Sequence, residues 1–175
     1  MAGAALFGAV QQMVTVFYSQ PQYQRTGMSA AGMGVAYAFM TISGLPGGFS
    51  ARLTEKIGRR RTLILLPLVS ALACFILALT KNGLLSVLAV SLFRVAFNLY
   101  QPLQATVQNQ AIRSEDRATA LSVHAVLLDG ITIPATLFLG RLSEGSLSAA
   151  FLLGAALCLG SMGLLGWAGR GKSSK

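Results

Sequence analysis

The sequence predicts an all-α membrane protein, a polytopic transmembrane helix bundle with six spans. Three observations support this fold class. Of 175 residues, 54% are hydrophobic and only 11% are charged, whereas soluble domains carry about 25% charged residues. The basic residues gather at the ends of long apolar segments rather than along one face. No stretch shows the alternation of apolar and polar residues that is typical of a half-buried strand.

Six segments approach the length of about 20 mostly apolar residues that a bilayer-spanning helix needs. They cover residues 2–20, 29–49, 62–80, 84–108, 118–140 and 147–168. They form one predicted transmembrane domain over 1–168, followed by a polar tail over 169–175. The first segment is the weakest because Gln11 and Gln12 interrupt it, and this weak start favours a truncated chain.

The connections between the segments are expected to be short. Lys81–Gly83 and Arg141–Gly145 are predicted turns, each with a glycine that relaxes the backbone. Within the second segment, Gly44 and Gly48 are four residues apart. This small-xxx-small spacing lets helices approach closely.

The segment Gly47–Arg61 is the most basic part of the chain and predicts the membrane topology. Its five basic residues are Arg52, Lys56, Arg59, Arg60 and Arg61. Cytoplasmic loops accumulate Lys and Arg, so we place this loop inside. Alternating spans then put ten basic residues inside and three outside, with Arg94 in a span. Both termini, including the polar tail, are therefore expected on the cytoplasmic side of a multi-pass cell-membrane protein.

Several function classes are not expected from the composition. The net charge of +9 is explained by the ends of the spans, so no nucleic-acid partner is predicted. Cys74 and Cys158 both lie in apolar runs and indicate neither a disulfide nor a metal site. With one histidine and no catalytic constellation, the chain is not expected to be an enzyme or to hold a cofactor or a metal.

Three spans each carry a polar stripe at helical spacing. Polar residues at membrane depth are expensive and usually face a bundle interior or a wet cavity. On the fourth span these residues are Arg94, Asn98, Gln101, Gln104 and Gln108; on the fifth they are Ser122, Asp129, Thr132 and Thr136; on the first they are Gln11, Thr15, Tyr18 and Gln22. The pattern favours a bundle around a water-accessible pathway.

Arg94 and Asp129 are the two charged residues deep within spans, at similar depth. The functional interpretation gives Arg94 a role in substrate binding and Asp129 a role in proton coupling. The alternative is an ion pair between them that is purely structural. His124 is a second candidate for proton coupling, or a packed histidine nearer the cytoplasm. Tyr23 is interpreted as an interfacial anchor.

Two motifs resemble a known family. Glu55-Lys56-Ile57-Gly58-Arg59-Arg60, between the second and third spans, resembles the D-R-x-G-R-R signature of the major facilitator superfamily. The run from Arg117 to Val123 resembles the start of the eleventh helix of that family. Glu55 replaces the usual Asp, Lys56 replaces Arg, and Ala51 stands where the signature has Gly. Such departures are common in the second, weaker copy of the motif.

The resemblance implies that the chain is the C-terminal six-helix half of a twelve-helix transporter. It implies alternating-access transport of a small organic solute, bound near the midplane between two halves. The pathway is expected to contain Arg94, Asn98, Gln101 and Asp129, with Gln11 and Tyr18 from the first span. Glu55, Lys56, Gly58, Arg59 and Arg60 would form a gating loop.

By the same resemblance, the expected partners are the substrate, the lipid bilayer and a second half. That half is either another copy of the chain or a separate chain. The alternative function is a non-transporting fragment, or an interaction subunit of a membrane complex.

Overall fold

The computed structural model describes residues 2–111 and 117–168, and these residues form helices joined by short connections. No strand occurs within these two ranges. The tail over 169–175 and the centre of the predicted link before the fifth span lie outside the described residues. The all-helical fold class is therefore confirmed for the described part of the chain.

The first predicted span is divided into three helical segments. These are α1 (Ala2–Gln12), a π-helical segment η1 (Met13–Tyr18) and α2 (Ser19–Arg25). π-Helical segments are rare in proteins, and those that occur often lie at functional sites. The second predicted span is also divided, into α3 (Ala30–Ser43) and a 3₁₀ segment η2 (Leu45–Phe49). Pro46 and two glycines in η2 disfavour continuation of the α-helix.

The remaining helices are longer. They are α4 (Ser50–Ile57), α5 (Arg59–Leu79), α6 (Gly83–Ala111), α7 (Arg117–Gly145) and α8 (Leu147–Ala168). Only Thr80, Lys81 and Asn82 separate α5 from α6, as the predicted turn requires. The predicted turn over Arg141–Gly145 is wrong, because these residues complete α7.

Three helices in the described ranges are long and apolar enough to cross a bilayer: Arg59–Leu79, Gly83–Val107 and Leu147–Leu164. The predicted count of six spans is therefore not supported by helix length and hydropathy. The 14 residues of α3 reach about 21 Å, which is shorter than a hydrocarbon core of about 30 Å. In the first predicted span, Gln11 and Gln12 lower the hydropathy where α1 gives way to η1.

The expected charged loop over Gly47–Arg61 is helical, so that prediction is wrong in secondary structure. Glu55 and Lys56 lie on α4, and α5 begins at Arg59. Only Gly58 separates these helices, with φ 91° and ψ 141°. Glycine suits that conformation because it has no Cβ to clash.

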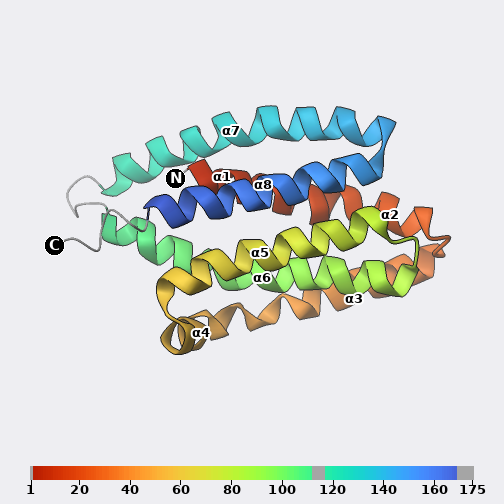
Figure 1. Cartoon of the computed structure of the whole chain (residues 1–175), viewed down its shortest axis with the longest axis horizontal. Helices are drawn as coiled ribbons and strands as arrows, with labels where there is room; N and C mark the ends of the chain where they lie inside the picture. The colour runs from red at the N-terminus through yellow and green to blue at the C-terminus, as the bar shows by residue number, and fades with distance from the viewer. Residues whose placement is uncertain (1, 112–116, 169–175) are drawn as a thin grey trace.

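The helices run side by side along the long axis of the molecule, with α7 at one edge and α3 and α4 at the other (Figure 1). Helix α5 packs against α6 and α8, α1 packs against α7 and α8, and α3 and η2 pack against α6. The beginning of α1, α4 and the end of α8 lie toward one end, here called the α4 end. The α5–α6 and α7–α8 connections lie at the other, here called the turn end (Figure 1).

Aromatic residues join α1 to α6 in the core. The ring of Phe7 lies 4.9 Å from that of Tyr100 and 5.4 Å from that of Phe97, both edge-on, measured between centroids. Cys74 on α5 and Cys158 on α8 are buried free thiols, so the interpretation of both as small buried residues is confirmed. The aromatic contacts hold α6 against α1, while the polar side of α6 remains open.

Candidate functional site

Helix α6 has two exposed stripes on roughly opposite sides, and the candidate site lies along one of them. Leu85, Leu88 and Leu92 form an apolar stripe and are 40–48% exposed. On the other side, Arg94 and Asn98 are half-buried and Gln101 is exposed. Between the stripes lies the buried aromatic face of the helix. The 100° step of an α-helix places positions 92 and 94 about 200° apart, so one side suits lipid and the other suits water.

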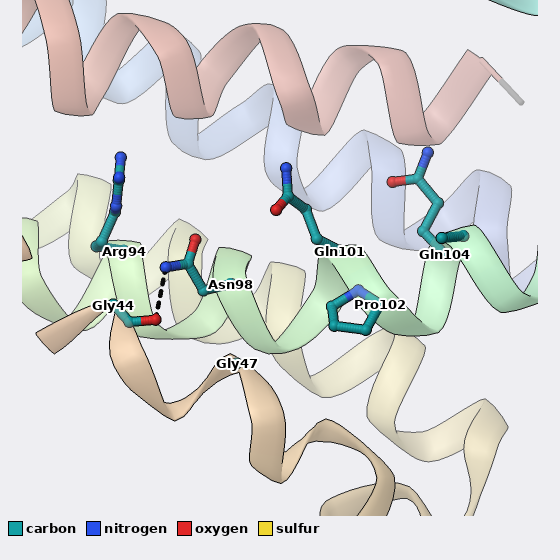
Figure 2. Close-up of a pocket in the computed structure, with 8 residues that line it drawn as sticks. Gly44, Gly47, Arg94, Asn98, Gln101, Pro102 and Gln104 are labelled. Atoms are coloured by element: carbon teal, nitrogen blue, oxygen red, sulfur yellow. Dashed lines mark hydrogen bonds between the residues drawn. The ribbon is translucent and has the colours of Figure 1, made fainter.

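The polar side of α6 borders a groove of about 760 Å³, here called the α6 groove. It is lined by Gly44, Gly47, Arg94, Asn98, Gln101, Pro102, Gln104 and Ala105. The side chains of Arg94, Gln101 and Gln104 project from the same side of α6, and the segment that carries Gly44 and Gly47 passes beside Asn98 (Figure 2). The volume lies within the range of about 300–1,000 Å³ of small-molecule sites.

Two glycines allow the chain after α3 to lie directly against α6. A Cβ at Gly44 would be 2.5 Å from Asn98 Nδ2, and one at Gly47 would be 3.1 Å from the Asn98 carbonyl oxygen. Asn98 Nδ2 donates a hydrogen bond of 2.8 Å to the carbonyl of Gly44 (Figure 2). The sequence paired Gly44 with Gly48, but a Cβ at Gly48 would meet nothing within 4 Å. Gly47 is therefore a site residue that the sequence reasoning missed.

Arg94 lines the groove, and the described part of the chain offers its guanidinium no counter-charge. Within the residues that the structure describes, no hydrogen bond or ion pair involves its guanidinium, and its Nε is buried without a partner. Eleven residues separate Arg94 from the start of α6 at Gly83, which corresponds to about 16 Å of helix. An unpaired buried donor carries a desolvation penalty that a bound acceptor would remove.

The other predicted pathway residues lie apart from Arg94. Asp129 is exposed on α7, and no ion pair joins it to Arg94 in the described ranges, so the structural ion pair is not formed. Gln11 donates a 2.9 Å hydrogen bond to the hydroxyl of Thr15, one turn further along in η1. Tyr18 is buried and donates a 2.6 Å hydrogen bond to the carbonyl of Leu139 on α7.

Tyr18 also borders a different hollow, of about 460 Å³, between η1 and α7. The side chain of His124 lies outside the described residues. The structure therefore brings together Arg94, Asn98 and Gln101. It does not bring Asp129, Gln11 or Tyr18 to the same groove.

The residues of the predicted gating segment surround the short connection between α4 and α5. Glu55 and Lys56 on α4, Gly58, and Arg59 and Arg60 on α5 are all exposed. The Ser50 hydroxyl donates a 2.7 Å hydrogen bond to the carbonyl of Leu99 and ties α4 to α6. The guanidinium of Arg52 lies 5.3 Å from the ring centroid of Phe49, a cation–π distance. The gating role of the segment that contains Glu55, Lys56, Gly58, Arg59 and Arg60 remains a prediction.

In the described residues, apolar helices of membrane length together with a polar groove along one of them are typical of membrane transport proteins. The family model of the Major Facilitator Superfamily matches residues 1–135. The chain belongs to this superfamily. Its members are solute transporters rather than enzymes; they bind small-molecule substrates and sit in lipid bilayers. Comparison with the curated proteins gave no match, and comparison with the solved structures gave none.

Proposed function

We propose that the chain forms one six-helix half of a transporter, the C-terminal one, and moves a small organic solute by alternating access. The observation that carries the proposal is the α6 groove, where Arg94 has no counter-charge among the described residues. In this proposal Arg94, Asn98 and Gln101 contact the solute. The match over residues 1–135 supports the general activity, transport across a membrane.

The proposal requires a second half over the open side of α6. A charged residue that faces lipid at the helix centre costs about 2.5–3.5 kcal/mol on insertion scales. Arg94 and Gln101 line an open groove rather than a closed core. A second copy of this chain, or a separate chain, would cover the groove and turn it into a pathway.

The proposed orientation places the α4 end of the bundle, with the beginning of α1 and the end of α8, on the cytoplasmic side of the cell membrane, so that both termini are proposed to be cytoplasmic. The basic residues of α4 and of the first turn of α5 support this orientation, because cytoplasmic segments carry the excess of Lys and Arg. Six spans are part of this proposal. In it, α3 and η2 together make the second span, and α1, η1 and α2 make the first.

Thiol labelling of Gln101→Cys in membranes tests whether the α6 groove is water-filled. We expect a membrane-impermeant maleimide to label this cysteine at least tenfold faster than Leu92→Cys, because alkylation needs a hydrated thiolate. Leu92 is the matched control, since it is exposed on the apolar stripe of the same helix. The two native cysteines are 0% exposed and contribute little background. Equal rates at both positions would contradict a hydrated pathway and favour a non-transporting interaction subunit.

Proton coupling is proposed to use Asp129, which is an exposed carboxylate on α7. Asp129→Asn is expected to abolish solute-driven proton flux, because the amide cannot take up and release a proton. The flux is measured with a pH-sensitive dye trapped in vesicles, as a panel of organic solutes is added. The amount of inserted protein should be unchanged.

Glu144→Gln is the matched control for Asp129→Asn, since Glu144 is also an exposed carboxylate on α7, near the turn end. It should leave the flux unchanged. Normal proton flux with the Asp129 variant would remove this residue from the coupling mechanism without affecting the proposed solute pathway.

A further inference from the structure

Arg94 borders a second hollow besides the α6 groove. This hollow, here called the α3 hollow, has a volume of about 390 Å³. Residues of η1 and α2 form one wall, residues of α3 form another, and Arg94 comes from α6. Arg94 thus stands where the α6 groove meets a pocket on the side of α2, toward the turn end of the bundle.

Two buried donor atoms of residues that line the α3 hollow have no hydrogen-bond partner among the residues that the structure describes. They are Arg94 Nε and the hydroxyl of Tyr23. Tyr23 is only 3% exposed, so solvent water does not supply the hydrogen-bond partner that its hydroxyl lacks. Buried polar groups are nearly always hydrogen-bonded. An occupant of the hollow that carries an acceptor group would offer a hydrogen-bond partner to these two residues.

The lining of the α3 hollow also determines the charge that it can accept. Among the described residues that line it, Arg94 is the one charged residue and none is a carboxylate. A guanidinium binds a carboxylate or phosphate through a fixed fork of donors. A cationic ligand would meet Arg94 without any compensating charge. The electrostatics of the hollow therefore favour an anion.

The rest of the wall is suited to an apolar body. The part of the wall that α3 contributes includes Met33, Tyr37 and Met40. Methionine adapts to irregular shapes and contacts aromatic rings through its sulfur, and tyrosine offers a flat apolar face. A ligand with one anionic group and an aromatic or aliphatic body matches both the polar and the apolar walls.

We infer that the solute of this transporter is a small organic monoanion with an apolar, preferably aromatic, body. Its anionic group accepts hydrogen bonds from Arg94 and from the Tyr23 hydroxyl, and its body packs against Met33, Tyr37 and Met40. Because Arg94 also lines the α6 groove, the same guanidinium holds the anion as it passes from the hollow to the groove. This inference rests on the proposed transport function and names its substrate class.

Protection of Gln20→Cys from alkylation tests the inference on the full chain in membranes. Gln20 is exposed and lines the hollow, so an occupant shields this position. Benzoate is the probe, and benzyl alcohol and benzylamine are the neutral and cationic controls of similar size. We expect saturating benzoate to slow alkylation at least fivefold, while the two controls change the rate less than twofold.

Two variants in the Gln20→Cys background connect the protection to the proposed contacts. Arg94→Gln should raise the benzoate concentration for half-protection at least tenfold. Tyr23→Phe should raise it about threefold to tenfold and leave thermal stability unchanged, since its hydroxyl has no protein partner. The second variant keeps the test decisive if Arg94→Gln fails to fold.

Equal protection by benzoate and benzyl alcohol would overturn the inference, as would benzoate protection that neither variant weakens. Absence of benzoate protection would also overturn it. If Gln101→Cys is still labelled rapidly in that case, the transport proposal stands and only the substrate class is wrong. If Gln101→Cys is also unreactive, the hydrated pathway itself is contradicted.

Discussion

Arg25→Ala is expected to lower the free energy of unfolding of the bundle by about 2–4 kcal/mol, because one guanidinium joins three helices at the turn end. Its terminal nitrogens donate to the Ser148 hydroxyl at 2.7 Å and to the carbonyls of Leu77 and Thr80 at 3.1 and 2.8 Å. Hydrogen bonds to charged groups contribute about 1.5–3 kcal/mol each, with overlap between bonds of one side chain.

The carbonyls that Arg25 contacts lie at the C-terminal end of α5, where no further turn of helix satisfies them. A cation is also favourable at this negative end of the helix dipole. Buried Gln22 adds hydrogen bonds to the Thr80 carbonyl and to the Ser86 hydroxyl. Removing Arg25 therefore weakens α2, α5 and α8 together.

Thermal unfolding of the purified chain in mild detergent measures the effect of Arg25→Ala. Buried Cys74 and Cys158 react with a thiol-sensitive fluorescent dye only as the bundle opens. We expect the midpoint to fall by about 4–16 °C, at about 2–4 °C per kcal/mol for a chain of this size. Lys81→Ala is the control, since it removes an exposed positive charge at the same end. Equal midpoints for the two variants would show that the three hydrogen bonds contribute nothing measurable.

The second large effect is expected from Gly44→Val, which places a branched side chain between η2 and α6. The Cβ of the new side chain alone would lie 2.5 Å from Asn98 Nδ2 and 3.2 Å from the Thr41 carbonyl oxygen. Asn98 must turn away and lose its hydrogen bond to Gly44, and the backbone after α3 must shift. Overpacking of this kind costs about 1–3 kcal/mol.

The matched control for Gly44→Val is Gly48→Val, because a Cβ at Gly48 meets nothing within 4 Å. In the same thiol-dye assay we expect the Gly44 variant to melt about 2–12 °C below the Gly48 variant. The Gly44 variant should also change the labelling rate of Gln101→Cys, since Gly44 lines the α6 groove. Coincident melting curves would mean that η2 does not need its close contact with α6.

Sequence reasoning identified the polar stripe on α6 because helical spacing alone decides which residues share a face. Arg94, Asn98 and Gln101 therefore appear in one groove, as predicted. Spacing could not show that Gly47, rather than Gly48, faces Asn98, because η2 is a 3₁₀ segment and its glycines do not follow the α-helical period. The π-helical segment η1 also departs from the α-helical period, so the spacing of residues in the sequence did not predict it.

Relations between helices were predicted less well than relations within them. Arg94 and Asp129 lie at similar distances from the ends of their predicted spans, which predicts a similar depth in the membrane. Depth does not tell which way a helix is rotated about its axis, however. In the described ranges the two residues form no ion pair. Tyr18 belongs to a polar stripe, yet its hydroxyl is satisfied by the backbone of Leu139. Tyr23 resembles an interfacial anchor in sequence and is buried in the structure.

The sequence by itself determined the helical class, the membrane environment and the family, because apolar length, basic clusters and short motifs are local properties of the chain. Only the tertiary structure decided which polar residues meet. It placed Arg94 between the α6 groove and the α3 hollow and left the hydroxyl of Tyr23 without a partner among the described residues. The reason is that burial and pairing depend on helix rotation and close backbone approach, which arise from the packing of segments far apart in the chain.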